Sequence, residues 1–135
     1  MSSHSELDII VDRDSVSAGD DCDSHEVLIT IPRMCPVQDF LFKFAWKKCP
    51  LPKIHGGSAT WLIISGEEPE ASIGVMAQQW EYPRLLISEF TTLDSIYKDK
   101  NSRRKVLYFR YYSHADPVEI YKLLLFQQPL PDRFT

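Results

Sequence analysis

The sequence SATWLIISGEEPEASIGVMAQQW, residues 58–80, consists of two apolar runs separated by a polar segment. The first run, TWLII at residues 60–64, contains β-branched and bulky side chains and no charge. This composition favours a strand that is buried on both faces of a sheet. The polar segment SGEEPE at residues 65–70 supplies turn-forming residues. We therefore expect a β-hairpin with a loop of about six residues at the centre of the fold.

The return run of this hairpin, residues 71–79, alternates between the two sides of a strand. Ile73, Val75 and Ala77 are expected to point one way. Gly74 lies between them, which predicts a bulge or a close approach of another backbone segment. The hairpin is expected to serve mainly as scaffold.

Two further strands are predicted at the beginning of the chain. Residues 7–11 (LDIIV) and 26–31 (EVLITI) are mainly aliphatic, and Pro32 ends the second run. The residues between them, 12–25, are polar and carry five acids and one glycine, so they are expected to form a loop. We expect the two strands to pair antiparallel.

Residues 36–48 (PVQDFLFKFAWKK) have the periodicity of a helix. Their apolar residues recur with helical spacing, at Val37, Phe40, Leu41, Phe44 and Ala45. Pro36 suits the first helical position, and Pro50 ends the segment.

The second half of the chain predicts strands at residues 84–88 and 106–112 and a short helix at 91–97 with a threonine cap. A last helix is predicted at residues 116–126. Its start carries a capping-box pattern, with Asp116 as N-cap, Pro117 in the first turn and Glu119 three residues after the cap. Its apolar stripe comprises Ile120, Leu123 and Leu124.

These elements predict one α+β domain spanning residues 1–135. The sheet is expected to be antiparallel or mixed, with about five to six strands and the helices on one face. Two main helices (36–48 and 116–126) and a short one (91–97) complete it. A hydrophobic content of 44% in 135 residues is sufficient for a hydrophobic core.

No apolar run approaches the ~20 residues of a membrane span, and the N-terminus lacks the pattern of a signal peptide. We therefore expect a cytoplasmic protein without membrane contacts. Cys22, Cys35 and Cys49 are odd in number and irregularly spaced, which predicts reduced thiols.

The net charge of −4 is unevenly distributed. Residues 1–26 hold eight acids and one base, a local charge of −7, whereas residues 98–110 hold six bases and one acid, a local charge of +5. The overall balance does not favour nucleic-acid binding, and the acidic end would attract a basic protein surface.

The first candidate site is the acidic loop around Asp20, Asp21 and Asp23. With Cys22 and His25 nearby it offers metal-binding side chains, but hard and soft donors are mixed and no zinc or calcium spacing is present. We expect no metal and no cofactor. The loop is interpreted as a solvated turn or as a docking patch for a basic partner.

The second candidate comprises Tyr108, Arg110, Tyr112 and His114. By alternation the first three share one face of a strand, and tyrosine and arginine are frequent at interface hot spots. The same residues would also suit a platform for single-stranded nucleic acid. The structural alternative is ordinary packing of aromatic residues on a sheet.

The third candidate is the end of the hairpin, Gln78, Gln79 and Trp80, where amides and an aromatic ring could contact a partner. No catalytic motif is present. His55 followed by two glycines does not make a phosphate-binding loop, and the G-x-S-x-G pattern is absent. A cysteine–histidine pair assembled by the fold stays open as an alternative. We expect a protein that is not an enzyme.

Five segments carry a resemblance to a known group: RDSVSAGDDCDSHE (13–26), GGSATWLI (56–63), IGVMAQQW (73–80), LYFRYYSHADP (107–117) and PLPDRF (129–134). Together they resemble small bacterial immunity proteins that accompany polymorphic toxins, including those of contact-dependent growth inhibition systems. The resemblance implies a small cytoplasmic α+β protein that binds one cognate toxin domain and blocks its active site or substrate surface. It assigns no role to any individual residue.

Many toxins of this group are nucleases, which implies a basic substrate groove. We therefore expect Asp20, Asp21 and Asp23, together with the edge formed by residues 110–116, to face the toxin. Two alternatives stay open. One is a nucleic-acid-binding or processing factor that uses the tyrosine and arginine strand and the basic loop. The other is a homomeric structural adaptor that pairs through an exposed sheet edge.

Overall fold

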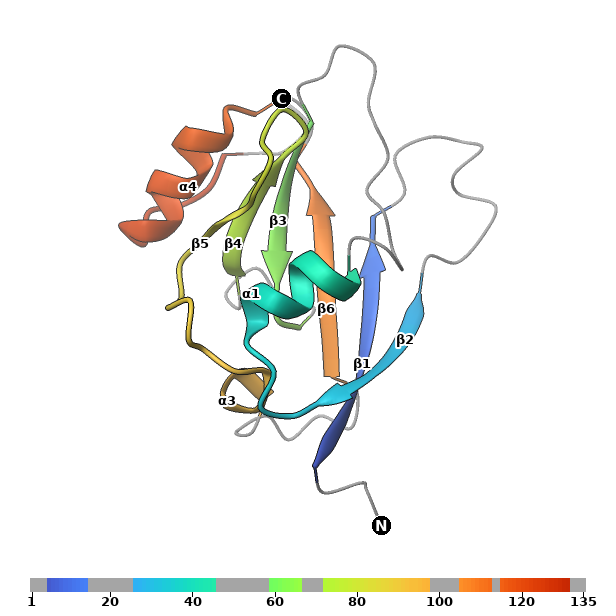
Figure 1. Cartoon of the computed structure of the whole chain (residues 1–135). Helices are drawn as coiled ribbons and strands as arrows, with labels where there is room; N and C mark the ends of the chain where they lie inside the picture. Colours follow the sequence, from blue (N-terminus) through green and yellow to red (C-terminus); the bar gives the residue numbers. More distant parts are fainter. Residues whose placement is uncertain are drawn as a thin grey trace.

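The computed structural model of the chain describes residues 5–14, 26–45, 59–66, 72–97, 105–112 and 115–131. The described residues form a twisted sheet with helices packed against it (Figure 1). In chain order the elements are β1 (Glu6–Arg13), β2 (Val27–Pro32), α1 (Val37–Phe40), η2 (Leu41–Ala45), β3 (Thr60–Ile64), β4 (Ser72–Ala77), β5 (Arg84–Leu85), α3 (Leu93–Tyr97), β6 (Lys105–Tyr111) and α4 (Pro117–Leu125).

The sheet has six strands in the order β2-β1-β6-β3-β4-β5. β1 pairs in parallel with β6, and every other neighbouring pair is antiparallel. The expected α+β class with a mixed sheet is therefore confirmed. The antiparallel pairing of the first two strands and the central hairpin of β3 and β4 are also confirmed.

β3 is buried along its whole length, as the charge-free sequence TWLII predicts. Trp61 and Ile63 belong to a large hydrophobic core on one side of the sheet. Leu62 and Ile64 belong to a smaller core on the other side. A strand with apolar side chains on both faces must be covered on both faces. An uncovered face would leave a row of large aliphatic groups in water.

The helices lie on both faces of the sheet, so the expectation that they share one face is wrong. α1, η2 and α3 cover the large core, on what we call the α1 face. α4 packs over β3 and β4 on the opposite side, the α4 face, where Ile120 is buried against Leu62 and Val75. The two-sided apolar character of β3 is the physical reason, since α4 removes its second face from water.

The helix expected at residues 36–48 begins at Val37 and continues beyond Phe40 as a π-helical turn. Pro36 is the N-cap residue with extended backbone, not the first helical residue. The expected stripe is buried at Val37, Phe40, Leu41 and Ala45. The side chain of Phe44 and residues 46–48 lie outside the described part of the chain. A π-turn accommodates one extra residue, and this changes the direction of the side chains that follow it.

A β-bulge changes the expected alternation of the return strand. The pairing shifts by one residue at Ile63 and Ile64, and as a result Ile73 joins the core on the α1 face while Val75 packs on the α4 face. The expectation that both point one way is therefore wrong. The bulge and close approach predicted from Gly74 are confirmed. A Cβ atom at this position would lie 2.7 Å from the carbonyl oxygen of Arg84 and 2.8 Å from Cδ2 of Leu85.

Replacing Gly74 by alanine should therefore destabilise the protein. The added methyl group would push β5 away from β4, since one of the two contacts is with backbone, which cannot rotate aside. Overpacking of this kind typically costs about 1–3 kcal/mol of unfolding free energy, and urea unfolding followed by circular dichroism would measure it. Ser72→Ala in the same strand is the control. An alanine at position 74 that leaves the unfolding midpoint unchanged would contradict the close approach.

The remaining expectations differ from the structure mainly in length. The strand expected at 84–88 is reduced to Arg84–Leu85. The threonine cap of α3 is confirmed, since Oγ1 of Thr92 accepts a hydrogen bond from the Ser95 amide at 3.2 Å. The N-cap of α4 is also confirmed, because the Asp116 carboxylate accepts from the Val118 amide at 3.0 Å.

Candidate functional site

The described residues beside the predicted sites lie at one end of the sheet. β1, β4 and β6 end there, whereas β2 and β3 begin there. Three backbone hydrogen bonds connect these strand ends: Asp14 N to Phe109 O at 2.9 Å, Gln78 N to Ala59 O at 2.8 Å, and Tyr112 N to Thr60 O at 2.7 Å. Candidate segments that are far apart in the sequence are thus anchored close together.

Asp14 is the main polar connection at this end. Its carboxylate accepts hydrogen bonds from the Tyr108 hydroxyl and, at 3.0 Å, from the backbone amide of Tyr111. Burial, the hydrogen bond to Asp14 and the nearby carboxylates raise the pKa of Tyr108 above its usual range. Tyr108 is therefore a neutral donor at physiological pH, held in place by Asp14.

The tyrosine and arginine strand contributes two side chains to the surface and one to the core. Tyr108 and Arg110 are half-buried on the α4 face, with the guanidinium 5.9 Å from the centre of the Tyr108 ring. Tyr112 is only 7% exposed, and its hydroxyl donates to the carbonyl of Pro131 at 2.8 Å. Tyr112 thus packs beneath α4 and is not part of the accessible surface.

The hairpin end is partly accessible. Gln79 is exposed, whereas Gln78 and Trp80 are half-buried. The guanidinium of Arg84 lies 4.8 Å from the centre of the Trp80 ring, and Trp80 packs against the smaller core. Trp80 therefore combines a packing role with an accessible edge.

Asp20, Asp21, Asp23 and His114 lie outside the described residues. Of the three cysteines, Cys35 is described, and it is a free thiol. Burial and the neighbouring Asp39 raise its pKa, so the thiol is protonated and a weak nucleophile.

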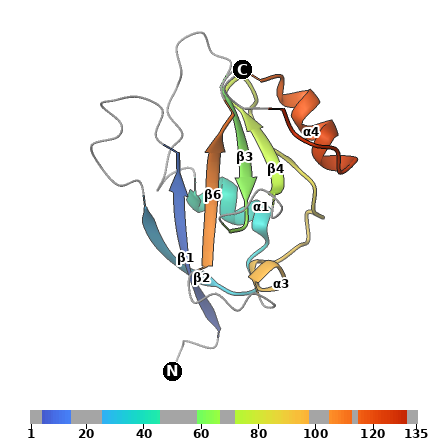
Figure 2. The ribbon, with the colours of Figure 1, turned by 180° about the vertical axis from the view of Figure 1, so that it is seen from behind.

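An acidic surface lies where α4 does not cover the sheet. Leu7, Ile9 and Val11 of β1 point into the large core, so the alternate residues Glu6, Asp8, Ile10 and Asp12 face the other way. Figure 2 shows α4 beside β4, at the far side of the sheet from β1 and β2. We call Glu6, Asp8, Asp12 and Asp14, with Leu28 and Thr30 of β2, the acidic face. Leu28 is 64% exposed, and Thr30 donates to the Asp8 carboxylate at 2.7 Å.

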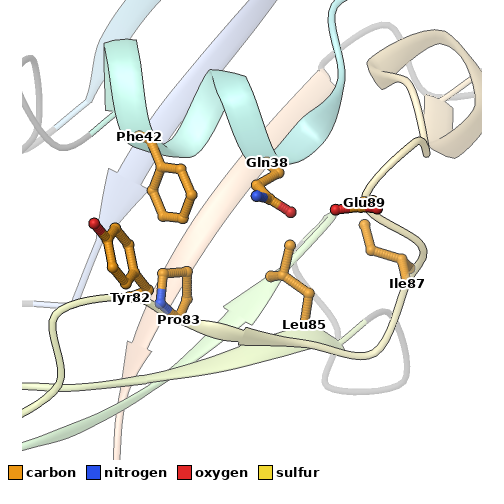
Figure 3. A pocket seen from close by; sticks show the side chains of 7 residues that line it. All are labelled: Gln38, Phe42, Tyr82, Pro83, Leu85, Ile87 and Glu89. Atoms are coloured by element: carbon orange, nitrogen blue, oxygen red, sulfur yellow. The ribbon is translucent and has the colours of Figure 1, made fainter.

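A second feature, on the α1 face, was not anticipated from the sequence. A pocket of about 380 Å³ opens between α1, η2 and the segment around β5 (Figure 3). We call it the aromatic pocket, and its lining residues are Gln38, Phe42, Tyr82, Pro83, Leu85, Ile87 and Glu89. The rings of Phe42 and Tyr82 meet edge to face with centroids 5.1 Å apart.

The pocket was missed because it joins two segments that are about forty residues apart in the chain. One weak signal was present in the sequence, since Phe42 is a large apolar residue that lies outside the buried stripe of its helix.

The described residues contain no cluster of three or more side chains that could hold a metal ion, and no helix among them is long and apolar enough to cross a membrane. Comparison with protein-family models, with curated proteins and with solved structures gave no match.

Proposed function

We propose that this chain is a non-catalytic binding protein that recognises a basic protein surface through its acidic face. Following the resemblance described above, we propose that the partner is a toxin domain with nuclease activity, which the chain neutralises as an immunity protein in the cytoplasm. The observation that supports this most is the row of carboxylates along the outward side of β1.

The arrangement of this row suits electrostatic docking. Glu6, Asp8 and Asp12 lie on one side of β1, and Asp14 follows the end of this strand. Arg110 is a base on the neighbouring part of the same face. Aligned carboxylates on a rigid sheet increase the rate at which a basic surface associates. Leu28 adds an exposed apolar contact beside them. Asp20, Asp21 and Asp23 follow Asp14 closely in the sequence, and we propose that they extend the same surface.

The nucleic-acid alternative is not favoured by these positions. Tyr108 and Arg110 lie on the same face as the acidic row, and Asp14 holds the Tyr108 hydroxyl. Carboxylates at these positions would repel a phosphate backbone. Titration with single-stranded DNA at low salt should therefore show no binding, and saturable binding that weakens with salt would favour the alternative.

The homomeric alternative depends on β2, which lies at the edge of the sheet. An edge strand can pair with a second copy of the chain through its unpaired backbone groups. Sedimentation at tens of micromolar protein separates the homomeric adaptor from the immunity protein. The isolated chain should be a monomer if it binds the toxin domain one to one.

The direct test uses the purified protein and the toxin domain encoded beside it. Glu6→Gln combined with Asp8→Asn removes two charges from the acidic face without removing side-chain bulk. At low salt the association rate should fall roughly tenfold, and the salt dependence should become weaker. Glu81→Gln combined with Glu119→Gln removes the same charge from exposed positions elsewhere and is the matched control.

Two results would contradict the proposal. If the unmodified pair forms no complex, the toxin assignment is wrong. If the pair binds but the acidic-face variant and its control behave alike, the acidic face is not the docking surface. Replacement of Asp20, Asp21 and Asp23 by alanine tests in the same way whether the acidic loop contributes.

A further inference from the structure

We propose that the aromatic pocket binds the guanidinium group of an arginine side chain presented by a protein partner. The pocket is large enough to enclose such a side chain, and its volume of about 380 Å³ lies within the range of small-ligand sites. Three properties of the lining suit an arginine side chain: its aromatic rings, its apolar floor and its single charged residue.

The rings and the floor suit a long side chain with an apolar stem. Figure 3 shows Phe42 above Tyr82 and Pro83, with Leu85 and Ile87 continuing the lining. Tyr82 is 58% exposed, so a ring is already available to a partner. A planar cation over an aromatic ring is attracted by the negative face of the ring, and the methylene groups of its stem can pack against proline, leucine and isoleucine.

Two oxygen acceptors of the pocket suit a cation, namely the Glu89 carboxylate and the side-chain amide oxygen of Gln38. Glu89 is the one charged residue among the seven that line it. Within the described part of the chain, neither the Glu89 carboxylate nor the Gln38 side-chain amide has a hydrogen-bond or ion-pair partner. The nearby bases are directed elsewhere, because Arg84 stacks on Trp80 at 4.8 Å and Lys43 lies 4.0 Å from Asp39. Among the described residues, therefore, no base neutralises the negative charge that the pocket presents.

Arginine fits this lining better than lysine. A guanidinium is planar and can stack on an aromatic ring while its N–H groups donate to a carboxylate and to an amide oxygen. An ammonium group is a compact, strongly hydrated charge that gains less from a ring that is half exposed to water.

The inference does not depend on the proposed function. The aromatic pocket lies on the α1 face beside β5, whereas the acidic face lies on the opposite side of the sheet beside β2, the other edge strand. The two sites can therefore be tested by separate variants.

The test is an NMR titration of the full chain with Nα-acetyl-arginine methylamide, a probe that mimics an arginine within a polypeptide. Shifts of backbone amide signals are expected at the lining positions that have an N–H. The matched probe is Nα-acetyl-citrulline methylamide, which has nearly the same shape without the charge. We expect the arginine probe to bind at least about fivefold more tightly than the citrulline probe. We expect the lysine derivative to bind more weakly than arginine.

Variants locate the binding in the pocket. Glu89→Gln and Tyr82→Ala change exposed side chains, so the fold should be retained, and each should weaken arginine binding several-fold. Glu81→Gln removes an exposed carboxylate next to Tyr82 that does not line the pocket, and it should leave binding unchanged. Equal binding of citrulline, equal binding of lysine, or shifts that persist in both pocket variants would each overturn the proposal.

Discussion

Replacing Trp61 by alanine should produce the largest loss of stability of any single change considered for this chain. Trp61 is 1% exposed in a central strand, and its ring lies 5.0 Å from that of Tyr111 on the adjacent strand β6. Deletion of a buried tryptophan side chain typically costs about 3–5 kcal/mol. Since domains are stable by only about 5–15 kcal/mol, the variant should be at most marginally folded.

The measurement is urea unfolding followed by far-ultraviolet circular dichroism, because fluorescence would be altered by the loss of the tryptophan itself. Trp61→Phe retains a ring against Tyr111 and should lose about half as much or less. Trp80→Ala is the control for tryptophan removal, since Trp80 is half-buried at a strand end. If Trp61→Ala were no less stable than Trp80→Ala, the central position of β3 in the core would be contradicted.

The position of Trp61 also shows how far local sequence determines this fold. A charge-free run of five bulky residues predicts burial on both faces, and β3 is buried on both faces. The side on which each helix packs is not a local property, because α4 is separated from β3 by more than fifty residues. The run TWLII already implied that both faces of the sheet must be covered. The expectation that all helices lie on one face was inconsistent with that implication.

The bulge at β4 illustrates a second limit. Gly74 predicted an irregularity, but the register shift opposite Ile63 and Ile64 is a property of the β3–β4 pairing that the sequence of β4 alone does not contain. A shift of one residue reverses the face of the side chains that follow it. For this reason the shared direction of Ile73 and Val75 was wrong although the strand itself was predicted.

For the candidate surfaces too, the local sequence predicted some features, whereas others depend on distant segments of the chain. Alternation alone placed Tyr108, Arg110 and Tyr112 on one face, and the structure agrees. Alternation does not reveal that α4 and the carbonyl of Pro131 cover Tyr112. The aromatic pocket required two distant segments to meet, so its residues had no common pattern in the sequence.

Replacing Asp14 by alanine is the change with the next largest expected effect. Asp14 follows the end of β1, and its carboxylate accepts a hydrogen bond from the backbone N–H of Tyr111 in β6. If β1 continued, a backbone carbonyl of β1 would accept this N–H instead. The Asp14 carboxylate also accepts a hydrogen bond from the hydroxyl of Tyr108. Alanine at position 14 would leave two half-buried donors, the Tyr108 hydroxyl and the Tyr111 N–H, without an acceptor, which costs more than the net value of a hydrogen bond. The loss of both bonds should lower the unfolding free energy by about 2–4 kcal/mol.

Asp14→Asn keeps the shape and one acceptor oxygen, so it should cost less than alanine. Asp8→Ala is the matched control, because the Asp8 carboxylate of β1 also accepts one hydroxyl, from Thr30 of β2, but is exposed. Its effect should stay below about 0.5–1 kcal/mol. Similar losses for Asp8→Ala and Asp14→Ala would show that Asp14 is not the main polar connection at this sheet end.

A spectroscopic measurement separates the role of Asp14 from a general loss of packing. The pKa of Tyr108 lies above its unfolded value of 10.0, so its contribution to stability is fully present below pH 10 and is lost as the pH rises further. Without the Asp14 carboxylate, two of the causes that raise this pKa disappear, and Tyr108 should ionise at lower pH in an ultraviolet titration. Tyr108→Phe identifies the signal. An unchanged titration in folded Asp14→Ala would mean that burial and the remaining charges, such as the Asp12 carboxylate, set the pKa without Asp14. In that case Asp14 would not hold the Tyr108 side chain on the acidic face.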